Sequence, residues 1–342
     1  MSTRDEPAGF GHTELPEPQR KALRSAIRLE WTTLGVMSLT VFAMYLVLGS
    51  SQAMQAAWVE DLLSLLPPIA FLVACRIIRL RPTEEHPYGF HRATAIAHLV
   101  AAVALLVMGA YLLFDSALTL IEGKHPTIGG VTLFGQTFWL GWLMILTLAA
   151  SAVAPIILGR RKLKLSEVLH DKVLYADADM NKADWATAVS GIVGVTGIGL
   201  GLWWADAAAA IVISASILHD GIKNLRAAVA GLSDTRARTY DDADPDPVGD
   251  RIDALLDGLR WVERAKSRVR DQGHVYHVES FVVPTHGKPP SLDEMERARE
   301  ACIDLDWKVQ DMVIVLAEEL PEEYLPGLTT GDARALGASG EK

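Results

Sequence analysis

Cysteine is nearly absent from this chain of 342 residues, which contains only Cys75 and Cys302. One lies in an apolar run and the other in a segment patterned like a soluble helix, so neither a disulfide framework nor a Cys-x-x-Cys metal site is indicated. Charge is scarce in the middle of the chain, because the acidic residues gather in the N-terminal arm and the C-terminal third. The formal net charge of −10 therefore says little about partners, and no nucleic-acid partner is predicted.

No cleavable targeting signal is predicted either. Residues 1–28 are polar and contain Pro7, Pro16 and Pro18, and the first apolar run begins too late for a signal peptide. We expect this arm to be disordered in its first half and basic where it approaches the apolar run. The polar C-terminal part shows no nucleophile, cofactor loop or acid–base pair, so neither an enzyme nor a prosthetic group is indicated.

Long apolar runs are what the chain does contain, and hydrophobic residues make up 50% of it. With about 20 apolar residues needed to cross a bilayer, six spans are predicted at residues 31–48, 58–78, 93–121, 137–158, 179–203 and 205–225. Lys and Arg cluster in the arm and after the second, fourth and sixth spans, whereas the opposite connections hold almost nothing but Lys124. The positive-inside rule then places both termini in the cytoplasm of a multi-pass protein of the cell (inner) membrane.

The composition changes again near residue 233, where an acidic, proline-broken linker is predicted over 233–247. Periodicity then predicts a helix at 248–259, strands at 261–270 and 274–283, a helix at 292–303 and a strand at 308–317. Ser291 followed by Glu294 matches a capping box. The predicted fold class is a membrane all-α six-helix bundle (29–232) followed by a cytoplasmic α+β domain (248–320) of ferredoxin-like αββαβ type. We expect this small domain to pair with a second copy, and residues 321–342 to form a flexible tail.

A cluster of polar residues stands at the predicted start of the fifth span. Asp177, Met180, Asn181 and Asp184 follow i, i+3, i+4, i+7 spacing and so share one helical face. A carboxylate at mid-depth in a bilayer costs about 2 to 4 kcal/mol, so its retention predicts a functional site. The alternative is a polar helix start at the cytoplasmic interface, where the helix dipole favours Asp177 and Asp179.

Several parts of the chain occur in an order typical of one family. They are the six spans with inside termini, the segment from His86 to Ala93 (HPYGFHRA) entering the third span, the Asp184-Trp185 pair, and the trailing α+β domain. In this order the chain resembles the cation diffusion facilitator (cation efflux) family of divalent-metal transporters. The resemblance covers about residues 29–319.

The resemblance implies a transport site shared by the second and fifth spans, each of which gives two ligands one helical turn apart. Counting back from the histidine segment places one pair at Glu60 and Ser64, with Asp61 adjacent, and the other at Met180 and Asp184. Two of these four positions are poor ligands, because Ser64 offers one weak neutral oxygen and Met180 a soft thioether.

Neighbouring residues can substitute for the poor ligands. Asp61 can face nearly the same direction as the expected pair, and Asp177 and Asn181 lie close to the level of the other pair. A site of Glu60 or Asp61 with Asp177, Asn181 and Asp184 would be nearly all oxygen, which favours Mn²⁺, Mg²⁺ or Fe²⁺ over Zn²⁺. The predicted metal ligands are Glu60, Asp61, Ser64, Asp177, Asn181 and Asp184.

Alternative interpretations remain for these positions. Glu60 and Asp61 follow a short external connection and could form a solvated helix end. Pro67 and Pro68 remove amide donors and should kink the second span, which could open carbonyls to an ion or simply bend the helix.

Histidines outside the predicted site are interpreted conservatively. His86 and His91 are read as loop contacts rather than metal ligands. In the α+β domain, relatives hold regulatory metals through His and Asp, but here the corresponding places read as Lys266, Glu279 and Glu318. His274 and His277 should point to opposite faces of a strand, so dimerisation is predicted for this domain rather than metal sensing.

The predicted function is a homodimeric exporter that exchanges a cytoplasmic divalent cation for a proton by alternating access across the lipid bilayer. The divalent cation is the substrate, and the proton would be carried by a carboxylate, Asp184 or Glu60. The alternative is a membrane scaffold or sensor that keeps the family fold but no longer transports, which Ser64 and Met180 make reasonable.

Overall fold

A computed structural model of the chain describes residues 15–78, 80, 83–133, 135–273, 275–285, 289–321 and 324. The chain divides into a helical unit, residues 15–233 with 240–243, and a sheet unit, residues 234–239 and those from 244 onward. The first half of the predicted N-terminal arm and nearly all of the predicted tail lie outside the described residues.

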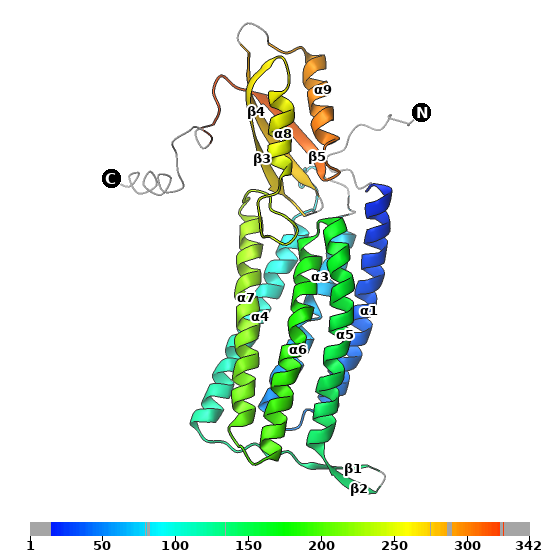
Figure 1. Cartoon of the computed structure of the whole chain (residues 1–342), viewed down its shortest axis with the longest axis vertical. Coiled ribbons are helices and arrows are strands. Elements are labelled where there is room, and N and C mark those ends of the chain that lie inside the picture. Colours follow the sequence, from blue (N-terminus) through cyan, green and yellow to red (C-terminus); the bar gives the residue numbers. More distant parts are fainter. Residues whose placement is uncertain are drawn as a thin grey trace, which may run out of the picture. The chain divides into compact units, whose positions relative to one another are not determined.

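The helical unit is a bundle of long helices that run nearly alongside one another (Figure 1). Its helices are α1 (Glu17–Val47), α2 (Gln52–Leu63), α3 (Leu66–Ile77), α4 (Ala93–Ile121), α5 (Leu140–Leu169), α6 (Lys172–Gly199) and α7 (Ala205–Leu232). A short antiparallel hairpin that the sequence did not predict, β1 (Gly130–Leu133) with β2 (Gln136–Trp139), joins α4 to α5. The second predicted span is thus broken into α2 and α3.

Five helical segments among the described residues are long and apolar enough to cross a membrane: α1, α2 with α3, α4, α5 and α7. The predicted fifth span, α6, does not reach this threshold of length and composition over its described residues. It nevertheless belongs to the same bundle, where it packs against α5 and α7 (Figure 1). The count of six spans therefore stays a prediction.

The boundary between α5 and α6 differs from the prediction. The basic residues expected in a connection after the fourth span extend α5 to Leu169, because Lys and Arg are good helix formers. The turn is made by His170, whose φ is 47°, and by Asp171, whose side chain accepts a hydrogen bond from the Leu174 N–H at 2.9 Å. Asp177 therefore lies beyond the first turn of α6, and its interpretation as a polar helix start was wrong.

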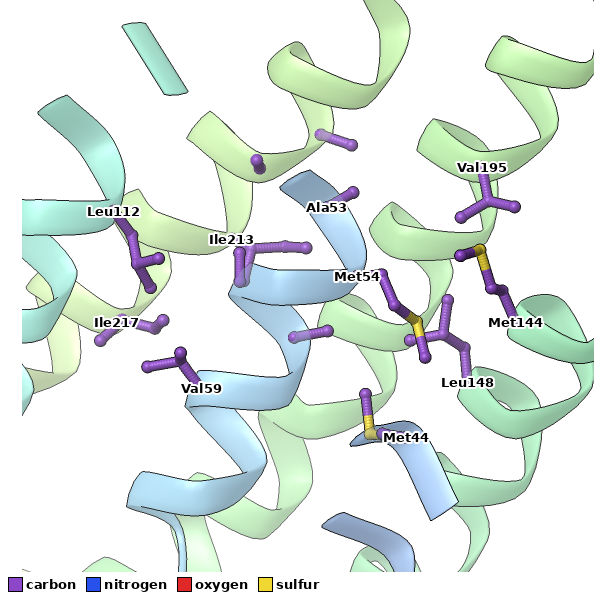
Figure 2. Close-up of a cluster of buried hydrophobic side chains, with 14 of the residues drawn as sticks. Met44, Ala53, Met54, Val59, Leu112, Met144, Leu148, Val195, Ile213 and Ile217 are labelled. Atoms are coloured by element: carbon purple, nitrogen blue, oxygen red, sulfur yellow. The ribbon is translucent and has the colours of Figure 1, made fainter. Parts of the chain in front are cut away.

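The core of the helical unit surrounds α2. Figure 2 shows this helix between apolar side chains of α4 and α7 on one side and of α5 and α6 on the other. The labelled side chains are Met44, Ala53, Met54, Val59, Leu112, Met144, Leu148, Val195, Ile213 and Ile217. Because α2 also packs against α1, it is enclosed by helices on several sides.

The sheet unit contains α8 (Val248–Asp257), β3 (Val262–Asp271), β4 (Tyr276–Pro284), α9 (Leu292–Ile303) and β5 (Val309–Leu316), in the predicted order of helix, strand, strand, helix, strand. The sheet order is β3-β4-β5, with β4 antiparallel to β3 and parallel to β5. Both helices contribute to one apolar core with the strands, so they cover the same face (Figure 1). The capping box of Ser291 and Glu294 is present at the start of α9.

Part of the predicted acidic linker is packed onto the sheet unit. The Ala237 N–H donates to the Val269 carbonyl at 2.9 Å, and the Asp246 N–H donates to the Ala237 carbonyl at 2.9 Å. The Tyr276 hydroxyl donates to Asp246 Oδ2 at 2.7 Å. These bonds tie residues on both sides of the linker's acidic centre to β3 and β4.

Candidate metal centre

The first turn of α2 is fixed by a buried carboxylate from α7. Asp206 accepts hydrogen bonds from the Ser51 hydroxyl and from the Gln52 N–H, both at 2.6 Å. Ser51 in turn caps the helix by accepting from the Met54 N–H at 3.1 Å. A carboxylate at a helix N-terminus satisfies otherwise unpaired donors and complements the helix dipole. This contact sets where α2 lies in the bundle and hence where its last turn falls.

The last turn of α2 brings Glu60, Asp61 and Ser64 together. Glu60 is 7% exposed and Asp61 is 9% exposed, so neither is a solvated helix end, as one alternative proposed. The Ser64 hydroxyl donates to the Glu60 carbonyl at 3.0 Å, which uses its hydrogen within its own helix. The helix ends here because Pro67 and Pro68, in the first turn of α3, cannot donate to it.

On α6, Asp177 and Asn181 are both buried, but other groups already occupy them. The Lys162 ammonium contacts Asp177 Oδ2, and Asn181 donates its side-chain N–H to Asp177 Oδ1 at 3.1 Å. Lys162 also lies 2.9 Å from Glu30 Oε2 of α1. In this conformation Asp177 is therefore the partner of an internal lysine rather than an open cation ligand.

Sequence reasoning missed Glu30 and placed Lys162 in a loop. The sequence did contain a signal for a buried ion pair, because Glu30 and Lys162 each continue the helical spacing of a stripe of residues that is buried. Glu30 follows Ala26 and precedes Thr33 on the buried face of α1, and Lys162 follows Leu158 on that of α5. A charged residue inside a buried stripe indicates a buried ion pair, but the spacing alone does not name its partners.

The crossing of α5 and α6 is close at the level of this charge network. A Cβ added to Gly159 would meet Asn181 Cβ at 3.0 Å and the Ala178 carbonyl at 3.2 Å. Small residues allow such close approach between membrane helices. Gly159 therefore brings the Asn181 level of α6 up against the backbone of α5.

Met180, at an expected ligand position, contacts a polar side chain of α7. Asn224 donates its side-chain N–H to Met180 Sδ at 3.8 Å, and its oxygen lies 3.0 Å from His98 Nε2 of α4. These three residues and Pro67 line a cavity of about 10 Å³, roughly the space of one water molecule. The contact turns the thioether toward α7 and gives His98 a polar partner within the bundle.

Asp184 lies in α6 two turns after Asp177, but its side chain is not among those that the structure describes. The helices that carry the two predicted half-sites, α2 and α6, pack against each other. Among the described residues no group of three or more His, Cys, Asp or Glu side chains is arranged to hold a metal ion. The described part of the predicted ligand set thus consists of Glu60, Asp61 and Ser64 on one helix and the lysine-bound Asp177 with Asn181 on the other.

The family model for the cation efflux transmembrane domain matches residues 31–233, more than half of the chain. The chain belongs to the cation efflux family. It is accordingly a multi-pass membrane protein of a family of transporters and not of enzymes.

Relatives with names that state a cation come from Bacillus subtilis (strain 168). The manganese efflux system protein MneS is 28% identical over 178 residues, 51% of this chain and 57% of that protein. The manganese efflux system protein MneP is 22% identical over 237 residues, 67% of this chain and 73% of that protein. The magnetosome protein MamB of Magnetospirillum gryphiswaldense is 23% identical over 156 residues, 46% of this chain and 48% of that protein. The chain thus matches little more than half the length of MneS.

In the sheet unit of this cation efflux family member, Glu279 stands at a place that corresponds to a regulatory metal ligand in relatives. Here it takes part in ion pairs. His277 contacts Asp311 and lies 3.1 Å from Glu279 Oε1. The hydrogen bond to Asp311 raises the pKa of His277, although burial opposes it. Burial would raise the pKa of Glu279, but its bonds to His277 and to Arg270 lower it overall. His274 lies outside the described residues, so its predicted direction on the strand stays a prediction.

Proposed function

We propose that this protein exports a divalent cation through a site between α2 with α3 and α6. The observation that carries the proposal is the pair of adjacent carboxylates, Glu60 and Asp61, each at most 9% exposed in the last turn of a broken helix enclosed by the bundle. Buried carboxylates within a membrane segment are costly and mark ion pathways. A cation is the natural partner of two such groups.

The proposed cation is a hard ion. Mn²⁺ is the leading candidate, and Mg²⁺ and Fe²⁺ are also favoured over Zn²⁺. Carboxylate and amide oxygens from Glu60, Asp61, Asn181 and Asp184 suit Mn²⁺ and Mg²⁺ better than ions that prefer sulfur or imidazole. Two relatives bear the name manganese efflux system protein, which supports the same ion. Asp177 would join the ligands only after Lys162 releases it.

Export is proposed to run by alternating access in exchange for a proton. Because no imidazole lies at the expected ligand positions, a carboxylate of the site, Asp184 or Glu60, would accept the proton when the cation leaves. The basic connections after the second and sixth spans support cytoplasmic termini.

The protein is proposed to act as a homodimer paired through the sheet unit. In the sheet order β3-β4-β5, β5 is an edge strand. It carries exposed apolar side chains at Val313, Val315 and Leu316. An exposed apolar edge strand is a surface that a second copy can cover.

Transport of Mn²⁺ into proteoliposomes tests the proposal. Asp184→Ala and Glu60→Gln should abolish the flux, because each removes an anionic ligand. The matched control is Asp179→Asn, an acidic residue of the same helix whose partner is the exposed Lys223 at 2.6 Å, and it should transport normally. Wild-type flux in Asp184→Ala would end the site assignment, and a strong preference for Zn²⁺ at equal concentration would end the metal assignment.

A second candidate function is a membrane scaffold or sensor that no longer transports. It is favoured by the hydrogen bond of the Ser64 hydroxyl to its own helix and by the contact of Met180 with Asn224, since both leave expected positions without a free ligand. Calorimetric titration with Mn²⁺, Fe²⁺, Mg²⁺ and Zn²⁺ separates the two functions. A scaffold should bind none of these ions at the membrane site, whereas an exporter should bind at least one.

A further inference from the structure

The break between α2 and α3 leaves backbone carbonyls without their usual donors. In an α-helix each carbonyl accepts the N–H four residues on, but Pro67 and Pro68 have none to offer to Leu63 and Ser64. The Leu65 N–H donates to the Leu62 carbonyl at 3.3 Å, and regular bonding resumes with the Ile69 N–H at the Leu65 carbonyl, 3.2 Å. Within the described chain, the carbonyls of Leu63 and Ser64 receive no hydrogen bond.

A buried carboxylate lies in the same turn as these carbonyls. Asp61 is 9% exposed, and its Oδ2 atom has no hydrogen-bond partner among the described groups. Inside a membrane protein an unpaired carboxylate oxygen and unpaired carbonyls are each costly. A cation is the kind of ligand that both a carboxylate oxygen and carbonyl oxygens can bind.

The break is also poor in positive charge from the backbone. The C-terminal end of α2 carries the negative end of its dipole, whereas the start of α3 would normally oppose it with free N–H groups. Two of the first three residues of α3 are prolines, so most of those N–H groups are missing. The local field therefore favours a cation over an anion.

We propose that the backbone carbonyls of Leu63 and Ser64 are ligands of the transported cation and, with Glu60 and Asp61, form an oxygen-only half-site on the broken helix. The inference rests on the proposed function and deepens it, because it names backbone ligands that a comparison of side chains alone does not reveal. The carbonyls supply the oxygens that the Ser64 hydroxyl and the Met180 thioether do not. Unwound carbonyls of broken membrane helices bind cations in this way, and an all-oxygen shell suits Mn²⁺ or Mg²⁺.

Restoring the missing amide donors tests this proposal. Pro67→Ala gives Leu63 an N–H partner and Pro68→Ala gives one to Ser64, so each should weaken Mn²⁺ binding by about tenfold or more in calorimetric titration of the full-length protein. Pro67→Val and Pro68→Val keep nearly the side-chain volume and should behave alike. The matched control is Pro155→Ala, a proline inside α5, which should bind Mn²⁺ as the wild type does.

A direct readout distinguishes coordination from a change in helix shape. With serine labelled by ¹³C at its carbonyl, Mn²⁺ should shift one component of the labelled amide I band, and Pro68→Ala should remove that shift. These results together would support the proposal.

Other outcomes would overturn the proposal, and they distinguish a failure of carbonyl ligation from a failure of the proposed export function. Wild-type Mn²⁺ affinity in the Pro67 and Pro68 variants would refute carbonyl ligation while leaving the proposed export function intact. An equal loss in Pro155→Ala would refute it too, because the effect would then be general to helix kinks. A wild-type protein that neither binds nor transports Mn²⁺ would overturn both proposals.

Discussion

Lys162 joins two buried carboxylates, and replacing it by methionine tests the charge network of the helical unit. Its ammonium lies 2.9 Å from Glu30 Oε2 and contacts Asp177, and the three side chains are at most 4% exposed. Methionine keeps an unbranched apolar stem but removes the charge. Two carboxylates would then remain inside the bundle without their common counter-ion.

The expected loss follows from the burial of all three groups. Removing one partner of a buried ion pair typically costs about 3–5 kcal/mol, because the remaining charge is left uncompensated. Lys162 serves two carboxylates, so we expect a loss near 5 kcal/mol. In a unit of about 150–250 residues each kcal/mol shifts the unfolding midpoint by roughly 2–4 °C, which predicts a fall of about 10–20 °C.

Thermal unfolding followed by tryptophan fluorescence in detergent micelles measures this change. Lys223→Met is the matched control, because Lys223 also pairs with an aspartate of α6, Asp179 at 2.6 Å, but is 59% exposed. An exposed pair is worth about 1 kcal/mol or less, so this variant should hardly shift the midpoint. Adding Glu30→Gln and Asp177→Asn to Lys162→Met should recover most of the loss, since the whole network becomes neutral.

Two results would refute the reasoning. The first is an equal midpoint for Lys162→Met and Lys223→Met, which would mean that the internal lysine is as well solvated as the surface one. The second is a triple variant no more stable than Lys162→Met, which would show that uncompensated carboxylates are not the source of the loss.

The remaining expectations concern other contacts of both units. Asp206→Ala leaves the first turn of α2 without its acceptor and should cost about 2–4 kcal/mol in the same thermal assay. Gly159→Leu should cost about 1–3 kcal/mol by overpacking against α6, whereas Gly35→Leu, whose added Cβ meets nothing within 4 Å, should cost less. His277, bound to Asp311, has a pKa raised above its ordinary 6.5, so its stabilising charge is fully present below that value and is lost as pH rises through the higher folded pKa. Hydrogen-exchange protection of β4 and β5 in the full-length protein, corrected for intrinsic rates, should therefore fall as pH rises, and His277→Gln should flatten the profile.

Each expectation has a contrary outcome. An unchanged midpoint for Asp206→Ala would mean that water replaces the carboxylate at no cost. Equal losses at Gly159 and Gly35 would show that leucine, rather than the close helix crossing, is the cause. Protection that rises with pH, or that is unaffected by His277→Gln, would contradict the assigned ion pair in the sheet unit.

The family and most of the fold were predictable because their signals are local. Apolar runs mark helices that must bury backbone polar groups, and alternation with period 2 marks strands. The capping box at Ser291 and Glu294 needs only four consecutive residues, and it starts α9 as predicted. The end of α5 was misjudged because its basic residues look like a connection, although nothing breaks the helix before His170.

The site was predictable only in part. Glu60 and Asp61 were named through the family resemblance, but their burial depends on the helices that enclose α2. The structure also places Asp177 with Lys162, which no spacing along α6 reveals. The predicted ligand role of Asp184 stays a prediction, since its side chain is outside the described set.

The sequence by itself determined which chemical groups this protein has: adjacent carboxylates, two prolines that cannot donate hydrogen bonds, and stripes of apolar residues that make helices. Only the tertiary structure decided which charges meet, because Glu30, Lys162 and Asp177 come from three helices and are brought together by packing. The physical reason is that a hydrogen-bond donor is lost locally wherever proline occurs, whereas the burial and pairing of a charge depend on neighbours from distant parts of the chain.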